Sequence, residues 1–227
     1  IENPKMQTQP LPHRSHSGNY LKDHPVENFG CSICHGGQDR ALSRKDAFAR
    51  IGDIHWEYPV IAVMYVQSSC GQCHISVFDR DQTLAGAEIL TQGRDLFLSE
   101  GCLSCHKVRD TGGSVSVELT DQGKKTALEY NFEFLTGERT TVNWLKEHFI
   151  DPQKVSPGSI MPKFNLDTAD MTALLTFTMS LYYPDYSIDY YSANMIEEIK
   201  GNRKSFEGQE AYDILCATCH GENGESN

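Results

Sequence analysis

Apolar residues recur at helical spacing in three segments, all between residues 83 and 184. Thr83–Ser99 predicts an amphipathic helix and Val142–Ile150 a shorter one, while a third helix begins at Asp167 or Thr168 and stops before Pro184. Aspartate and threonine are both favoured helix N-caps. The predicted inward positions are Leu84, Ala87, Leu90, Leu96, Phe97, Val142, Leu145, Phe149, Met171, Leu174, Leu175, Leu181 and Tyr182.

Outside these helices the hydrophobic pattern is weak. Residues 1–30 are rich in Pro, His, Asn and Ser and show no regular period. Residues 40–51 carry a partial helical pattern, and 60–66 form an apolar run far shorter than the roughly 18 residues of a membrane span. Residues 185–200 have the character of a linker. We therefore expect a mostly α-helical protein with long loops and no membrane span.

One short motif, C-x-x-C-H, occurs four times and accounts for all eight cysteines. Composition alone predicts about 0.01 such motifs in a chain of this size. The two thiols can add to the vinyl groups of a haem, and the histidine that follows can bind the iron. The copies are motif 1 (Cys31, Cys34, His35), motif 2 (Cys70, Cys73, His74), motif 3 (Cys102, Cys105, His106) and motif 4 (Cys216, Cys219, His220).

Other uses of paired cysteines fit these motifs less well. Paired C-x-x-C motifs build all-cysteine zinc sites, but the histidine after every pair is then unexplained. Thioredoxin-like motifs lie next to a βαβ pattern, which this chain lacks. A disulfide framework needs no histidine at a fixed position. We therefore expect four covalently attached haem c groups, each with its iron.

Covalent haem attachment predicts an extracytoplasmic location, in the periplasm or outside the cell, because the thiols must be handled on the oxidising side of a membrane. The start, Ile1-Glu2-Asn3-Pro4, has no signal-peptide pattern and is what we expect of a mature or trimmed chain. The formal net charge of −11 argues against nucleic acid as a partner. It favours docking to basic or mixed patches on redox proteins, although acidity also serves solubility.

Residues 1–80 hold motifs 1 and 2, which start 39 residues apart, too close for two separate monohaem domains. We expect a compact dihaem module in which the haems form the core, with Gly36 and Gly37 letting the backbone pass close to a macrocycle. Three histidines, His13, His16 and His24, lie in the polar segment before motif 1. We expect bis-histidine ligation of both irons by His24 and His55, with His16 in reserve.

The arrangement of His24-Pro25, motif 1 with Gly36-Gly37, His55-Trp56 and motif 2 resembles the N-terminal part of multihaem cytochromes associated with bacterial quinol-oxidising cytochrome b complexes. The resemblance implies a redox partner of that membrane-bound kind. It does not assign either histidine to a particular iron.

Residues 81–184 resemble the monohaem class I cytochrome c domain. The matching pieces, in order, are Gly93 with Phe97, motif 3, Trp144-Leu145 with Asp151-Pro152, Ser159-Ile160-Met161-Pro162, and the closing helix to Leu181-Tyr182. The resemblance implies a helical fold and makes Met161 the distal ligand opposite His106. We leave His148 out of the ligand set, because its position on the middle helix is usually solvated in that fold.

Residues 201–227 restart the cytochrome c pattern with Gly208…Tyr212, motif 4 and Gly224, without a methionine loop or closing helix. Seven residues after His220 cannot enclose a porphyrin. We expect either a fragment of a longer protein, with this second domain truncated, or completion of the site by a neighbouring subunit.

No Ser/His/Asp pattern, P-loop or dinucleotide motif is present. We therefore expect an electron-transfer protein rather than an enzyme. Methionine ligation raises a haem potential relative to bis-histidine ligation, so low-potential haems would precede a higher one along the chain. The alternatives are a subunit of a polymeric extracellular cytochrome filament, or a haem reductase or peroxidase with an open iron at His220.

Overall fold

The computed structural model describes residues 16, 19–38, 40–48, 58–182, 209, 212–213 and 216–221. About half of these residues are helical, and the strands among them are β1 (Lys107–Val108) and β2 (Thr111–Gly112), which form one antiparallel pair. The expected mostly α-helical fold with long loops is confirmed. Within the described part, no helix is long and apolar enough to cross a membrane.

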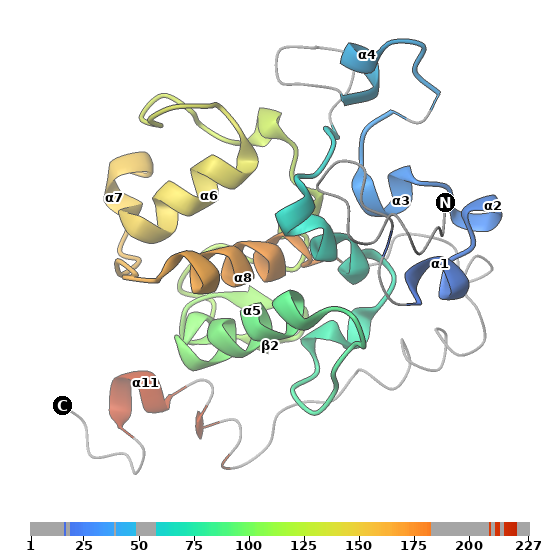
Figure 1. The fold of residues 1–227 in the computed structure, drawn as a ribbon. Coiled ribbons are helices and arrows are strands. Elements are labelled where there is room, and N and C mark those ends of the chain that lie inside the picture. Colours follow the sequence, from blue (N-terminus) through green and yellow to red (C-terminus); the bar gives the residue numbers. More distant parts are fainter. Residues whose placement is uncertain are drawn as a thin grey trace.

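Two helices, α5 (Glu88–Ser99) and α8 (Thr168–Met179), lie side by side at the centre of the molecule (Figure 1). Gly93 makes their close crossing possible, because a Cβ atom there would lie only 1.9 Å from the carbonyl oxygen of Ala173. The rings of Phe97 and Phe177 pack beside this crossing with centroids 5.2 Å apart. Leu174 and Leu175 are almost fully buried in the same core.

The start of α8 confirms the sequence prediction. Asp167 is its N-cap, and the Asp167 side chain accepts a hydrogen bond of 2.8 Å from the backbone N–H of Asp170. Helix α5 begins at Glu88 rather than Thr83, because Gly86 makes a turn with φ +82° just before it. The remaining predicted helix is α6 (Thr141–Ile150), which is followed at once by α7 (Pro152–Val155).

The inward face of α5 differs from the prediction at three positions. Leu96 is only half-buried, whereas Leu98 and Arg94 are 4 % and 3 % exposed. The guanidinium of Arg94 donates to the carbonyl oxygens of Asp79 (2.7 Å) and Gln82 and pairs with Asp95 at 2.9 Å. Because its charge and donors are satisfied in this way, Arg94 can be buried and fasten the 79–82 segment to α5.

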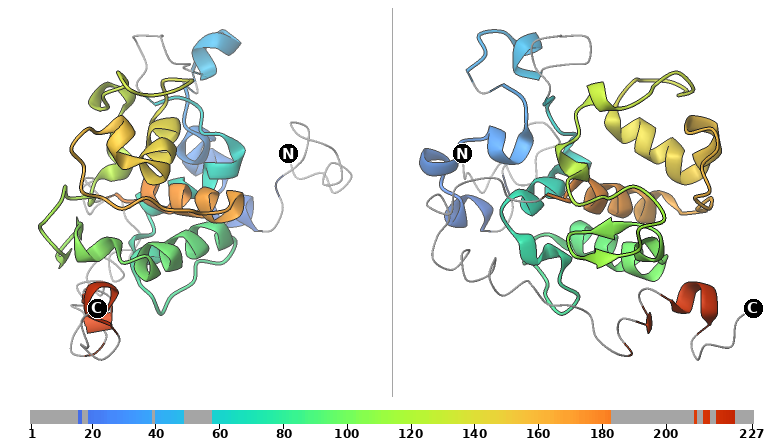
Figure 2. Two further views of the ribbon diagram at one scale, coloured as in Figure 1. Left: turned by 90° about the vertical axis from the view of Figure 1, so that its left-hand side faces the viewer. Right: turned by 180° about the vertical axis from the view of Figure 1, so that it is seen from behind.

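Helices α6 and α7 lie on the opposite side of α8 from α5 (Figures 1 and 2). Thr140 caps α6, since its Oγ1 accepts a hydrogen bond of 3.0 Å from the backbone N–H of Asn143. Leu145 and Phe149 turn inward from α6 and join the core. Short 3₁₀ turns, η4 (Cys102–Ser104), η5 (Gln122–Lys124) and η6 (Ala127–Glu129), connect these helices.

The N-terminal part is built from short pieces. They are α1 (Tyr20–Asp23), α2 (Val26–Phe29), α3 (Ser32–His35), α4 (Arg44–Phe48) and the 3₁₀ segments η2 (Val63–Gln72) and η3 (Ile75–Phe78). The partial helical pattern over 40–51 yields only α4, and residues 49–57 lie outside the described ones. Val63 and Met64 of the apolar run are 58 % and 50 % exposed, so this run forms no protein core.

The segment around motif 2 is packed directly against the central helices. A Cβ on Gly71 would lie 2.0 Å from the carbonyl oxygen of Ser180, just after α8. Phe78 stacks on Phe177 with ring centroids 6.1 Å apart, and the Gln67 side chain accepts a hydrogen bond of 3.0 Å from the backbone N–H of Leu90. Motif 2 therefore has a fixed position relative to the domain that carries motif 3.

Candidate haem-binding sites

Motif 1 occupies the single helical turn α3 and is held by the segment that follows α4. The carbonyl oxygen of His35 accepts a hydrogen bond of 2.8 Å from the backbone N–H of Ile61. Gly36 and Gly37 have φ values of +66° and +75°, and a Cβ on Gly36 would lie 2.6 Å from the carbonyl oxygen of Pro59. In the structure, the close approach that these glycines allow is to a neighbouring chain segment.

Motifs 1 and 2 lie next to each other. The hydroxyl of Ser69 donates a hydrogen bond of 2.5 Å to the carbonyl oxygen of Cys34. Burial raises the pKa of the Cys70 thiol to about 11, and the nearby Cys34 adds to this shift. Burial and Cys34 likewise raise the pKa of Cys73. Groups bound to these two motifs would therefore be neighbours.

Each of these two motifs faces an imidazole from the N-terminal segment. The ring centroids of His16 and His35 are 5.9 Å apart, and those of His24 and His74 are 6.0 Å apart. When two imidazoles bind one metal from opposite sides, each metal–nitrogen bond is about 2.0 Å long and each nitrogen lies about 1.1 Å from its ring centroid. The two ring centroids are then about 6.2 Å apart. Both pairs therefore have the spacing that one iron between two histidines requires.

The environments of these histidines also suit a metal. Burial, and next the neighbouring His16, lower the pKa of His35 and favour its neutral form. The Nδ1 of His24 lies 3.1 Å from the carbonyl oxygen of Tyr20. With the proton on Nδ1, this contact leaves Nε2 free to bind a metal, which is the usual arrangement of a ligating histidine.

The structure thus brings His16 and His24 to the motifs, and it pairs His16 with motif 1 and His24 with motif 2. We had placed His24 and His55 in the ligand set, with His16 in reserve. His55 lies outside the described residues, as does His13. The pairing itself could not be found from sequence, because no spacing rule connects these histidines to either motif.

Motif 3 lies in a tightly bonded loop after α5. The β1–β2 hairpin follows it, and the backbone N–H groups of Gly113 and Ser116 donate to the carbonyl oxygens of Leu103 (2.8 Å) and Cys105 (3.0 Å). This wrapping places the carbonyl oxygen of Val117 2.8 Å from Nδ1 of the buried His106. The contact fixes the ring and leaves Nε2 available to a metal.

The loop that carries Met161 is held against α6. The backbone N–H of Phe164 donates a hydrogen bond of 2.9 Å to the carbonyl oxygen of Phe149, and Lys163 pairs with Asp151 at 2.7 Å. Ser159 supports the loop from within, since its Oγ accepts a hydrogen bond of 3.2 Å from the Met161 N–H. Met161 is partly buried and packs against the helical core.

The structure does not place His148 in the solvated position that the family resemblance implies. Its Nδ1 is buried and finds no hydrogen-bond partner among the described residues. The ring stacks on Trp144, one helical turn earlier, with centroids 4.7 Å apart and planes inclined by 11°. Burial, and next the charge of His106, lower the pKa of His148 to about 4. His148 is therefore partly buried, and burial favours its neutral form.

Motif 4 forms the helical turn α11 (Ala217–His220), and the structure describes little around it. The backbone N–H of Cys216 donates a hydrogen bond of 2.8 Å to the carbonyl oxygen of Tyr212. The Tyr212 hydroxyl donates to the carbonyl oxygen of Gly221, also at 2.8 Å. The side chain of Cys219 lies outside the described ones.

The cysteines whose side chains are described form no disulfide. Burial raises the pKa of Cys102 to about 12, which is the opposite of the lowered pKa of a reactive or zinc-binding thiolate. No group of three or more His, Cys, Asp or Glu side chains in the described part of the chain has the arrangement of a metal site. The C-x-x-C-H pattern and the raised thiol pKa therefore fit haem attachment better than a reactive thiolate.

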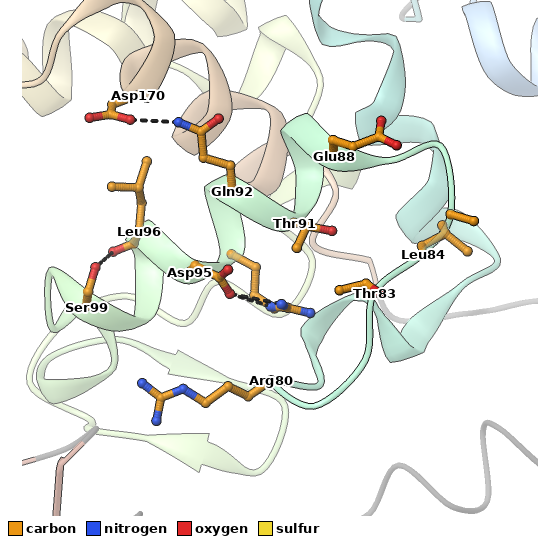
Figure 3. Close-up of a pocket in the computed structure, with 12 residues that line it drawn as sticks. Arg80, Thr83, Leu84, Glu88, Thr91, Gln92, Asp95, Leu96, Ser99 and Asp170 are labelled. Carbon is orange, nitrogen blue, oxygen red and sulfur yellow. Dashed lines mark hydrogen bonds and ion pairs between the residues drawn. The ribbon is translucent and has the colours of Figure 1, made fainter. Parts of the chain in front are cut away.

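The surface also carries a hollow beside α5, lined by residues between 80 and 99 and by Asp170 (Figure 3). Figure 3 shows the hydrogen bond of 2.8 Å from Gln92 to Asp170 and the Arg94–Asp95 pair at its edge. No cysteine or histidine lies among its described lining residues. Its lining includes Arg80, Thr83, Leu84, Glu88, Thr91, Leu96 and Ser99.

Comparison with known proteins places the central helical domain in a class. Residues 90–181 match the family model of cytochrome c, and this match spans motif 3, the Met161 loop and nearly all of α5 and α8. The central part of the chain is therefore similar to c-type cytochrome domains, a class that holds covalently bound haem c and transfers electrons. Domains of this class are typically extracytoplasmic.

Over 94 residues the chain is 28 % identical to cytochrome c oxidase subunit 2 of Alkalihalophilus pseudofirmus. The aligned region covers 41 % of this chain and 26 % of that relative, so the chain spans about a quarter of the relative's length. No solved structure gives a significant match.

Proposed function

We propose that this protein is a tetrahaem c-type cytochrome that carries electrons along haems attached to motifs 1 to 4. The observation that carries the proposal is the presence of two imidazole pairs, His16–His35 and His24–His74, with centroid separations of 5.9 and 6.0 Å. They lie at two adjacent C-x-x-C-H motifs and beside a cytochrome c domain.

The residues of the chain then have definite roles. The paired cysteines of each motif hold haem through thioether bonds, and His35, His74, His106 and His220 are the proximal ligands. His16, His24 and Met161 are the distal ligands of the first three sites in this proposal, whereas the sequence favours His55 over His16. Haem iron supplies one-electron redox chemistry, and these ligands tune its potential.

The packing supports electron transfer from motif to motif. The Ser69–Cys34 hydrogen bond joins motif 1 to motif 2. The close approach of Gly71 to Ser180 packs motif 2 against the central helical domain. Bis-histidine sites at motifs 1 and 2 would have lower potentials than a His106/Met161 site. Electrons would therefore run from the N-terminal module toward the central domain.

The proposed location is extracytoplasmic, and the proposed partner is a membrane-bound quinol-oxidising cytochrome b complex or another cytochrome. The net charge of −11 favours docking to a basic surface on that partner. The match of the central domain to a protein named as an oxidase subunit supports a role beside respiratory complexes.

Intact mass of the native chain tests the haem count. We expect the mass of the polypeptide plus four haems, and one haem fewer when both cysteines of a single motif are replaced by serine. A wild-type chain with three or fewer haems, or a double-serine variant with an unchanged mass increment, would contradict the proposal.

The partner is tested by mixing the oxidised protein with membranes that contain a quinol-oxidising cytochrome b complex and a quinol. We expect reduction that is inhibited together with the complex and slows as salt screens the acidic surface. Reduction that is equally fast in membranes lacking the complex would exclude it as the partner. A dithionite-reduced sample serves as the reference for complete reduction.

A further inference from the structure

Two separate segments of the N-terminal part converge on one carbonyl oxygen of the central domain, that of Gly86. The Tyr20 hydroxyl donates a hydrogen bond to it, and so does the Gln67 side chain, at 3.1 Å. Burial, and next Glu88 and Cys70, raise the pKa of Tyr20, so its hydroxyl keeps its proton and can donate. Gly86 is therefore a common anchor for α1 and for the segment that leads into motif 2.

The turn at Gly86 is shaped to receive Tyr20. Its φ of +82° is a conformation that favours glycine, and a Cβ atom there would lie 2.7 Å from the Tyr20 hydroxyl oxygen. The same turn leads into α5, whose N-cap residue, Ala87, has no polar side chain to cap the helix. Gln67 takes that role, because its Oε1 accepts a hydrogen bond of 3.0 Å from the backbone N–H of Leu90. The anchor is thus fixed to the first turn of a central helix.

Tyr20 also holds the histidine that faces motif 2. Its carbonyl oxygen accepts a hydrogen bond of 2.8 Å from the backbone N–H of His24 and lies 3.1 Å from His24 Nδ1. The ring of His24 then faces that of His74, with centroids 6.0 Å apart and planes inclined by 81°. One residue therefore connects His24 to the central domain, because its hydroxyl binds the domain and its carbonyl oxygen binds the histidine.

A role in packing alone would explain such a contact more simply, but the surroundings of Tyr20 argue against it. The Tyr20 side chain is 37 % exposed and does not belong to the buried core cluster. Gln67 is half-buried and makes two hydrogen bonds to the same turn, so the turn does not depend on Tyr20. What depends on the Tyr20 hydroxyl is the position of α1 and of His24.

We infer that Tyr20 is a positioning residue for the iron at motif 2. Through its hydrogen bond to Gly86 it keeps His24 opposite His74, so that Nε2 of His24 can bind the metal. Without the hydroxyl, α1 loses this tether and His24 leaves the iron more often, which opens the distal position. The inference rests on the proposed function, because it requires haem at motif 2 with His24 as a ligand.

The test is the rate at which carbon monoxide binds to the reduced full chain. Carbon monoxide enters a bis-histidine site only after one histidine has left the iron. In Tyr20→Phe we expect one haem per chain to bind it about three- to tenfold faster than in the wild type, the change that loss of one hydrogen bond predicts. An unchanged rate would overturn the inference.

Tyr58→Phe is the matched control, because it removes a hydroxyl from an exposed tyrosine next to motif 1. The Tyr58 side chain is 51 % exposed, and its carbonyl oxygen accepts a hydrogen bond of 3.1 Å from the backbone N–H of Gly37. We expect this variant to bind carbon monoxide at the wild-type rate. An acceleration equal to that of Tyr20→Phe would overturn the inference.

A further variant separates positioning from loosened packing. Gln67→Met removes both hydrogen bonds that Gln67 makes to the turn before α5 but keeps the Tyr20 hydroxyl. We expect it to lower the denaturant midpoint while accelerating carbon monoxide binding less than Tyr20→Phe does. An acceleration as large as that of Tyr20→Phe would show that packing alone controls the site, and would overturn the inference.

His24→Ala shows whether Tyr20 acts through His24. The distal position is already open in this variant, so we expect the added change Tyr20→Phe to have no further effect on the rate. A further acceleration would overturn the inference. If His24→Ala opens a fast-binding haem and Tyr20→Phe alone does not, only this inference fails. A missing haem in the intact mass, or a His24→Ala variant without a fast-binding haem, would mean that the proposed function itself fails at motif 2.

Discussion

The guanidinium of Arg109 donates a hydrogen bond of 3.1 Å to the carbonyl oxygen of Ile75. Ile75 directly follows His74, and Arg109 is three residues after His106, so this bond connects motif 2 to motif 3. Arg109 has a positive φ of 55°, an unfavourable conformation for a side chain other than glycine. Its N–H donates to Thr120 Oγ1 at 2.6 Å, and its guanidinium lies 5.9 Å from the Phe78 ring centroid.

We predict that Arg109→Ala lowers the free energy of unfolding by about 1–3 kcal/mol, because a charged hydrogen bond and the contact with Phe78 are lost together. Denaturant unfolding of the haem-loaded protein measures the change. Arg80→Ala is the control, since Arg80 is exposed at the edge of the surface hollow and should change stability by no more than about 0.5 kcal/mol. Equal stability losses in the two variants would contradict the role given to Arg109.

The crossing of α5 and α8 leads to a second prediction. In Gly93→Ala the added methyl group would overlap the carbonyl oxygen of Ala173, at 1.9 Å, and the helices would have to move apart. We expect the free energy of unfolding to fall by roughly 2–4 kcal/mol, although alanine is the better helix former. Gln92→Ala, on the exposed side of the same helix, is the control and should lower the free energy of unfolding by less than about 1 kcal/mol. Thermal or denaturant unfolding measures the stability of both variants. A Gly93→Ala variant more stable than the wild type would contradict the close packing.

The sequence predicted the helical domain well because protein side chains form its core. Cap preference placed the start of α8 at Asp167 or Thr168, and the apolar period identified the buried positions Met171, Leu174 and Leu175. The start of α5 was placed too early, because Gly86 makes a turn that apolar spacing does not register. Arg94 was missed as a core residue, since its partners are carbonyl oxygens of another segment.

The N-terminal histidines were harder to assign for a different physical reason. Where haems are expected to replace a protein core, few apolar residues need to be buried, and η2 keeps Val63 and Met64 exposed. Without an apolar period, the chain path that brings His16 to His35 cannot be derived from spacing. The buried Nδ1 of His148 was missed because His148 lies beside the apolar face of Val142, Leu145 and Phe149 rather than on it, and apolar spacing does not show its stacking on Trp144.

A third prediction concerns alkaline pH. Burial, with a smaller contribution from Glu129, raises the pKa of Tyr130, whose hydroxyl accepts a hydrogen bond of 2.5 Å from Gln122. The folded protein therefore keeps this proton more tightly than the unfolded chain, in which tyrosine titrates near pH 10. The stability contributed by neutral Tyr130 is complete below about pH 10 and is lost as the pH rises above it.

We expect Tyr130→Phe to reduce this alkaline loss, and denaturant midpoints measured from about pH 8 to pH 11 would show it. Tyr58→Phe, at a side chain that is 51 % exposed, is the control and should retain the wild-type profile. If both variants keep the wild-type slope, Tyr130 is not the group responsible.

The final prediction distinguishes the ligand pair that the structure favours, His16 and His24, from the pair that the sequence favours, His24 and His55. Removing a distal imidazole leaves the haem covalently attached but opens one coordination position. Because His16 faces His35 and His24 faces His74, we expect His16→Ala and His24→Ala each to produce one high-spin haem per chain. His55→Ala should leave every bis-histidine haem low-spin. Electron paramagnetic resonance and carbon monoxide binding measure the number of open sites, and intact mass confirms that no haem is lost. A high-spin haem in His55→Ala, with His16→Ala unchanged, would reverse the assignment and make His55 the ligand.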